Sequence, residues 1–203
     1  MNESYYKLCL KELDQIDKPK RILLHSCCAP CSSHVITFLT KYFDITILYY
    51  NPNIAPIEEY NKRKAEQIRL INEIETLNKI DIIDCDYDNN IYEEKIRGYE
   101  ECPERGARCT ICFNLRLEKT AQMAKENNYD YFCSTLTVSP YKNAPLINQI
   151  GEALSKKYDI KWLYSDFKKA EGYKKSIELS KKYGLYRQDY CGCIYSQRKN
   201  IMD

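Results

Sequence analysis

The chain has 203 residues, a length that fits one sizeable domain with a full hydrophobic core. Apolar residues make up 44% and charged residues 30%, as in water-soluble globular proteins, and the formal net charge of +2 gives little global support for nucleic-acid binding. No apolar stretch approaches membrane-spanning length, and the first residues lack the basic and apolar regions of a signal peptide. We therefore expect a cytoplasmic protein with no membrane partner.

Short apolar runs alternate with amphipathic segments along the whole chain. The amphipathic pattern predicts helices at residues 5–16, 32–40, 57–77, 90–97, 112–127, 146–158 and 172–183. The short runs predict strands at residues 21–25, 44–50, 81–85, 129–135 and 160–164. This alternation is typical of an α/β fold with a parallel sheet and helices on both faces. We expect a single domain over residues 1–203, with a helical extension at 1–20 and an irregular metal-binding tail at 185–203.

Seven of the eleven cysteines gather in three clusters that are far apart in the sequence. The clusters are Cys27, Cys28 and Cys31; Cys109 and Cys112; and Cys191 and Cys193. Clustered cysteines in a cytoplasmic protein are more often metal ligands or redox groups than disulfides. The first cluster follows the first predicted strand, and ligands of open parallel sheets bind at the carboxyl ends of strands. The pattern therefore predicts a soft-metal site assembled by the fold.

The number of thiols exceeds what one metal centre needs. A four-iron cluster takes about four cysteines, so the other three, with Asp189, would suit a mononuclear metal with an open position. Because neighbouring side chains diverge in an extended segment, we expect Cys27 and Cys28 to reach two different centres. The alternatives are that one or two of the seven cysteines bind nothing, and that Asp189 only caps a loop.

The remaining cysteines and the two histidines have less chemical signal. We expect Cys9, Cys85 and Cys133 to be small buried hydrophobes, and His25 and His34 to be structural. Cys102 lies near the second cluster, and its role stays open. Lysine pairs within residues 168–182 could contact phosphates, or they could form an ordinary solvated helix face.

Five segments of the chain resemble one family when they are taken together. They are residues 25–32, 51–60, 108–113 with Arg116 and Leu117, 135–143, and 185–193. This combination resembles the QueH-type epoxyqueuosine reductases from about residue 20 to the C-terminus. The family's cysteines fall on the seven that the chemistry had already selected.

The resemblance implies a fold, a reaction and cofactors. It implies a HUP-like, Rossmann-like sheet and the last step of queuosine synthesis, in which an epoxide at the wobble base of tRNA is reduced to an alkene with loss of water. It further implies a [4Fe-4S] cluster beside a mononuclear iron, with the division of the seven cysteines left open and Asp189 on the iron. Candidate proton donors are Asp189, Tyr141 and Tyr190. Because no flavin or nicotinamide motif is present, electrons are expected from an external low-potential carrier.

Three other classes fit the sequence less well. A sulfonucleotide reductase shares the Cys-Cys and Cys-x-x-Cys spacing but needs a nucleophilic cysteine in a Glu-Cys-Gly-x-His tail, which this chain lacks. An ATP-using enzyme of this fold needs a Ser-Gly-Gly-x-Asp-Ser loop where residues 26–31 stand, and proline with cysteines cannot offer the same backbone donors. A non-catalytic zinc module would not need seven thiols.

Overall fold

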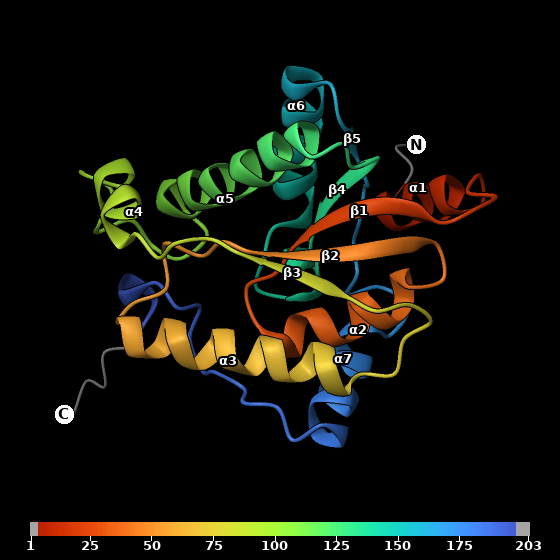
Figure 1. Cartoon of the computed structure of the whole chain (residues 1–203). Helices are drawn as coiled ribbons and strands as arrows, with labels where there is room; N and C mark the ends of the chain where they lie inside the picture. The colour runs from red at the N-terminus through yellow and green to blue at the C-terminus, as the bar shows by residue number, and fades with distance from the viewer. Residues whose placement is uncertain (1–3, 198–203) are drawn as a thin grey trace.

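The computed structural model describes residues 4–197, so parts of the expected N-terminal extension and C-terminal tail, and both ends of the expected domain, lie outside the described residues. Five parallel strands form one sheet in the order β3-β2-β1-β4-β5 (Figure 1). The strands are β1 (Lys20–His25), β2 (Phe43–Tyr49), β3 (Asp81–Asp84), β4 (Tyr131–Ser134) and β5 (Lys161–Trp162). This strand order is that of a Rossmann-like sheet. It confirms the predicted α/β fold of the HUP-like, Rossmann-like kind.

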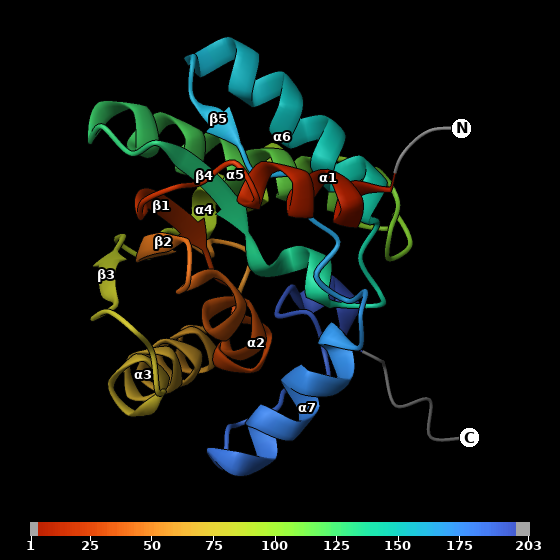
Figure 2. The ribbon, with the colours of Figure 1, turned by 90° about the vertical axis from the view of Figure 1, so that its right-hand side faces the viewer.

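Helices cover both faces of the sheet, as predicted (Figures 1 and 2). The helices are α1 (Tyr5–Leu13), α2 (Ala29–Leu39), α3 (Ile57–Glu73), α4 (Asn89–Lys95), α5 (Ala107–Glu126), α6 (Ala144–Tyr158) and α7 (Gly172–Lys182). Helices α5 and α6 pack together on one face, whereas α2, α3 and α7 lie on the other. Short 3₁₀ turns, η1 (Thr135–Val138) and η2 (Ile194–Ser196), follow β4 and the last cysteines.

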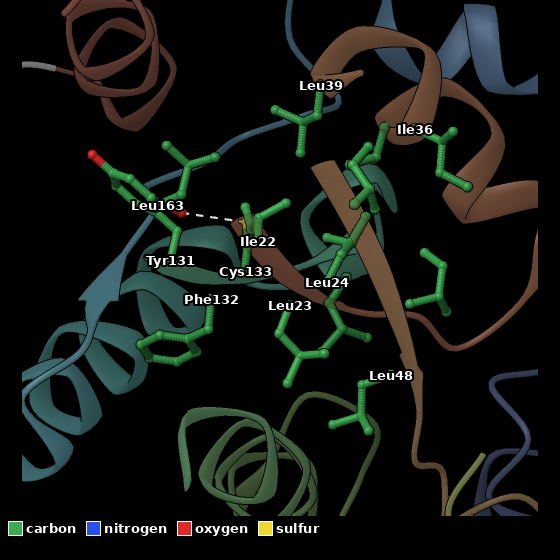
Figure 3. Close-up of a cluster of buried hydrophobic side chains, with 14 of the residues drawn as sticks. Ile22, Leu23, Leu24, Ile36, Leu39, Leu48, Tyr131, Phe132, Cys133 and Leu163 are labelled. Atoms are coloured by element: carbon green, nitrogen blue, oxygen red, sulfur yellow. Dashed lines mark hydrogen bonds between the residues drawn. The ribbon is translucent and has the colours of Figure 1, made fainter. Parts of the chain in front are cut away.

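The central strands are apolar on both sides because helices cover both faces. Ile22, Leu23 and Leu24 on β1 are all 0% exposed. In Figure 3, Leu23 and Phe132 point toward α5, while side chains of α2 approach from the opposite side. This packing fixes β1 between β2 and β4, with His25 opposite both Leu48 and Ser134. The loops that leave β1 and β4 therefore start side by side.

Two helices, α2 and α5, begin at least three residues earlier than predicted, and both shifts change the site. Helix α2 begins at Ala29 rather than residue 32, with Cys28 as its N-cap and Pro30 in its first turn, where proline is well tolerated. Helix α5 begins at Ala107 rather than residue 112, so Cys109 and Cys112 both lie in its first turns. The polar segment before Cys109 concealed this start. None of the described helices is both long enough and apolar enough to cross a membrane.

Candidate metal centre

A cavity of about 250 Å³ opens at the carboxyl ends of β1 and β4. These strands are neighbours, but the chain continues from β1 toward β2 and from β4 toward β5. This topological switch point is where open α/β sheets bind ligands. The loop after β1, the segment after β4 and the C-terminal tail supply the walls, and among them stand Cys27, Cys31 and Cys191. The first cysteine cluster is therefore located where the sequence placed it.

The first cluster forms a compact thiol triad. The Sγ atoms of Cys27, Cys28 and Cys31 all lie within 4.8 Å of one another, close enough for one metal ion. The expectation that Cys27 and Cys28 diverge is wrong, because their Sγ atoms are 3.8 Å apart. The chain changes from strand to helix at Cys28, so the alternation of an extended segment does not apply there.

One thiol of the triad is prepared to ionise. Hydrogen bonds from Cys28 and Cys31, together with the charge of Arg116, hold the pKa of Cys27 well below its ordinary value despite burial. The same hydrogen bonds raise the pKa values of Cys28 and Cys31. The thiolate is the form that binds metal. Cys27 can therefore offer the first metal ligand while Cys28 and Cys31 are still protonated.

The other four clustered cysteines meet beside the triad. Cys109, Cys112, Cys191 and Cys193 line a second, smaller cavity, and Cys191 lines both cavities. Cys112 and Cys193 are buried in one cluster with Tyr92, whose hydroxyl oxygen is 3.1 Å from Cys193 Sγ. Within residues 4–197, only the triad has three ligand atoms within 4.8 Å of one another, so the thiols of this second group are more widely spaced. All three cysteine clusters nevertheless lie at the carboxyl ends of the strands, around the two cavities.

Two buried cations separate the thiol groups. Lys142 and Arg116 line both cavities. Lys142 Nζ donates to Cys191 Sγ at 2.8 Å, and its side chain is 10% exposed. Burial lowers the pKa of Lys142, but the nearby Cys191 thiolate outweighs it and raises that pKa above its ordinary value. The sequence did not predict that Lys142 and Arg116 lie among the thiols. The one available signal was that Arg116 follows Cys112 by four residues, a spacing that places two residues on the same face of a helix.

Helix α3 holds the cysteine-bearing tail in place. Arg63 is 1% exposed and donates from Nη1 to the carbonyl oxygen of Cys191 at 3.2 Å and from Nη2 to that of Tyr190 at 3.3 Å. Its Nε donates to Glu59 at 2.6 Å. Gly192 lies against Arg63 with a φ of +105°, a conformation that favours glycine. We call the hydrogen bonds from Arg63 to the Cys191 and Tyr190 carbonyl oxygens the Arg63 clasp. No sequence motif predicted it.

The three candidate proton donors, Asp189, Tyr141 and Tyr190, all line the larger cavity. Asp189 is exposed, and Tyr141 is 59% exposed at the rim. The Tyr190 hydroxyl donates to the carbonyl oxygen of Ala55 at 3.0 Å, so its proton is already engaged by the protein. Beside Asp189, Gln188 donates from Nε2 to Cys28 Sγ at 3.0 Å.

Of the residues expected to be structural, Cys9, Cys133 and His25 are fully buried, whereas Cys85 and His34 are partly buried. Cys9 and Cys133 are 0% exposed in the core, and Cys85 is half-buried against it. His25 is 0% exposed, with Nδ1 2.9 Å from Ser134 Oγ and Nε2 3.3 Å from the Tyr50 carbonyl oxygen, and burial lowers its pKa to about 3. His34 lines a separate small cavity.

Cys102 contributes to the structure through its backbone rather than through its thiol. It lines neither of the two cysteine-lined cavities. Its carbonyl oxygen accepts a hydrogen bond from the buried Arg108 at the start of α5.

The donor set fits a soft metal centre. Thiolates select iron–sulfur clusters, zinc and similar soft metals, and the buried Nη2 of Arg116 has no hydrogen-bond partner among the described residues. An unpartnered buried cation beside thiols is what an anionic metal–thiolate group would satisfy. The fold and site thus define a class of Rossmann-like protein with a thiol-rich centre at the switch point.

Comparison with known proteins gives the family. The family model described as "Epoxyqueuosine reductase QueH" matches residues 22–199. The chain is 45% identical to the "Epoxyqueuosine reductase QueH" of Streptococcus pyogenes over 90% of this chain and 72% of that protein. It is 46% identical to the one of Staphylococcus epidermidis over 92% of this chain and 80% of that protein. The chain belongs to the epoxyqueuosine reductase QueH family, a family of oxidoreductases.

A solved structure also resembles the chain at low sequence identity. It is described as a predicted subunit of tRNA methyltransferase from Methanocaldococcus jannaschii, with a TM-score of 0.49 and 15% identity over 79% of this chain and 76% of that one. A likeness at this level carries no conclusion about function.

Proposed function

We propose that this chain reduces epoxyqueuosine to queuosine at the wobble position of tRNA in the cytoplasm. Its family and the thiol-lined cavity at the switch point support this reaction. Removing the epoxide oxygen to leave an alkene consumes two electrons and two protons and releases water. The observation that carries the proposal is that all three cysteine clusters line two cavities that share Cys191, Arg116 and Lys142.

The residues present fit a [4Fe-4S] cluster and a mononuclear iron. We propose that the seven clustered cysteines hold both centres and that Asp189 completes the iron site. When bound, these centres would supply the electrons and a Lewis acid for the epoxide. Lys142 would keep its hydrogen bond to the Cys191 sulfur and so would fix the tail over the cavity.

The cavity walls would position and protonate the substrate. Asp189 stands in the wall and is open to solvent. Because a carboxylate bound to the iron carries no proton, Asp189 can donate one only where it is not bound to the iron, and Tyr141 at the rim is the next candidate. Tyr190 ranks last because its hydroxyl already donates to Ala55. A metal site sheltered by the tail would also keep water from competing with the substrate.

The partners follow from the same geometry. Tyr173 and Ser176 of α7 line the cavity, so α7 would lie against a bound anticodon loop. Of the lysines around α7, Lys168 pairs with Asp166, Lys174 with Glu171 and Lys182 with Glu75. Those pairs lower the charge available to tRNA phosphates, so we propose contact by part of this face only. We propose an external low-potential carrier as the electron donor.

The proposal is tested by asking which substrate the metal-loaded protein reduces, epoxyqueuosine in tRNA or a sulfonucleotide. Protein reconstituted with iron and sulfide without oxygen should be brown and should convert epoxyqueuosine in tRNA to queuosine with a low-potential reductant. Cys112→Ala should lose metal and activity together, whereas Cys85→Ala should keep both because Cys85 lines neither cysteine-lined cavity. Reduction of a sulfonucleotide with no effect on the tRNA would replace the proposal with its rival. A colourless zinc-loaded protein without either activity would favour a binding module.

A further inference from the structure

Arg116 is the buried arginine whose hydrogen bonds are incomplete. It is 1% exposed, and its Nε donates to the carbonyl oxygen of Cys112 at 3.3 Å, within its own helix. Its Nη2 has no partner among residues 4–197. A buried donor without a partner is expensive, and a buried charge without one is more so. The missing partner is therefore expected to be an acceptor with negative charge.

Within the described part of the chain, the other buried cations near the two cavities have hydrogen-bond partners, so the unpartnered donor is particular to Arg116. Arg63 donates to Glu59, Cys191 and Tyr190. Arg108, earlier on the same helix as Arg116, donates from Nη1 to the carbonyl oxygens of Glu100 and Cys102, both at 2.5 Å. Lys142 already donates to the Cys191 sulfur. Among these buried cations, Arg116 is the one with a donor reserved for something else.

The position of Arg116 indicates what that partner is. It lines the large cavity with Cys27 and Cys31 and the small cavity with Cys109, Cys112 and Cys193. Its pKa is raised, against the effect of burial, by thiolate charge at Cys112, Cys191 and Cys27. The guanidinium therefore stands between the two thiol groups with a free N–H.

We propose that Arg116 is the fixed cation of the metal centre: its Nη2 donates a hydrogen bond to sulfur of the bound cluster, and its charge raises the reduction potential of that cluster. The proposal rests on the proposed function, because it takes an iron–sulfur cluster as the group held by the cysteines. A positive charge stabilises the more negative reduced form, and hydrogen bonds to sulfur are among the factors that set these potentials. The buried setting strengthens both effects.

The experiment compares three variants after anaerobic reconstitution. Arg116→Gln removes the charge, Arg116→Lys keeps it but loses the fork of donors, and Lys119→Gln removes one charge from the same helix outside the cavities. Iron, sulfide and the midpoint potential of the cluster are measured on each protein without substrate. We expect the equilibrium constant for one-electron reduction to fall at least tenfold in Arg116→Gln, equivalent to about 59 mV more negative. The midpoint potential of Arg116→Lys should lie between those of Arg116→Gln and wild type, and the potential of Lys119→Gln should equal that of wild type.

The outcomes separate the two proposals. A fully loaded Arg116→Gln with the wild-type potential would overturn the role of Arg116. Uptake of iron by Arg116→Lys but not by Arg116→Gln would support a required cation. Failure of both to load, with a wild-type circular dichroism spectrum, would make Arg116 a structural support and overturn the proposal. Wild-type protein that carries the cluster but leaves the tRNA epoxide intact would refute the proposed function, whatever the potentials.

Discussion

Arg63 and Cys191 are 128 residues apart in sequence, yet Arg63 Nη1 donates to the Cys191 carbonyl oxygen at 3.2 Å. The Arg63 guanidinium is oriented by Glu59, four residues earlier on α3. On the other side of the clasp, the Ala55 amide donates to the Gly192 carbonyl oxygen at 2.9 Å. These contacts fix the tail that carries two of the seven clustered cysteines through its backbone and do not involve the two thiols.

Removing the Arg63 clasp should release the tail. Arg63→Met leaves the poorly solvated Glu59 without its ion pair and with only the Tyr186 hydroxyl as a donor, so we expect a loss of about 3 kcal/mol in unfolding free energy, measured by urea denaturation of metal-free protein. We also expect severe loss of iron uptake. Arg69→Met is the matched control, since Arg69 donates to the Tyr183 and Gly184 carbonyl oxygens just before the tail, and its side chain is 37% exposed. It should cost within about 1 kcal/mol and keep its iron. Equal iron content in both variants would contradict the clasp.

Glycine at position 192 should be required for metal loading. A Cβ there would lie 2.9 Å from both Arg63 Nη1 and Ile54 Cγ1, in addition to the strain of a φ of +105°. Gly192→Ala should therefore displace Cys191 and Cys193 and reduce iron content sharply. Gly184→Ala also has positive φ, +55°, but its Cβ would meet nothing within 4 Å. It should cost only about 1 kcal/mol of backbone strain and load normally. Normal iron content in Gly192→Ala would show that the tail can shift without losing the site.

Asp189→Asn should separate chemistry from assembly. Asparagine keeps the shape of the side chain but loses its charge and its proton. We expect the brown cluster to remain, tRNA binding to change little, and epoxide turnover to fall severely. The visible spectrum, iron content and single-turnover alkene formation are measured on one sample. Normal turnover would make Asp189 a loop residue only, and loss of the entire cluster would make it a support for the cluster.

The buried His25 should make the fold sensitive to mild acid. Its pKa is about 3 in the folded protein, lowered first by burial, against an ordinary value of 6.5 in the unfolded chain. The folded state therefore binds fewer protons between these values, so stability is full above pH 6.5 and falls as the pH drops below it. Between pH 7.5 and 5.5, carboxylates contribute little to the change in stability, because their ordinary pKa values lie below this range.

The comparison is urea unfolding of metal-free wild type and His25→Gln at those two pH values. The decrease in unfolding free energy should be about 1 kcal/mol larger in wild type. An equal decrease in both proteins would show that His25 is not the group responsible.

The sequence predicted the parts of the site that depend on local pattern. Alternating apolar runs gave the parallel sheet, and the cysteine clusters fell near the ends of elements. The relation between Cys27 and Cys28 was wrong because the first turn of α2 starts within the motif, and a helix start reorients consecutive side chains. The start of α5 was hidden because the buried Arg108 is stabilised by carbonyl groups of a preceding loop.

The sequence could not predict contacts that only tertiary packing creates. Lys142 meets Cys191 across 49 residues, and nothing local marks that lysine as a partner of sulfur. The incomplete hydrogen bonding of Arg116 is likewise visible only when its neighbours are in place. Such groups surround the motifs rather than belong to them, so the sequence identified the clustered cysteines but not their electrostatic environment.

The most direct test is a single-turnover reaction without oxygen, with iron, acid-labile sulfide and alkene measured on the same reconstituted sample. We expect more iron than sulfide, because a mononuclear iron would accompany the cluster, and conversion of tRNA epoxyqueuosine to queuosine in proportion to the loaded protein. Equal iron and sulfide with full conversion would show that no mononuclear iron is needed. A fully loaded, reduced protein that leaves the epoxide unchanged would show that this chain is not an epoxyqueuosine reductase.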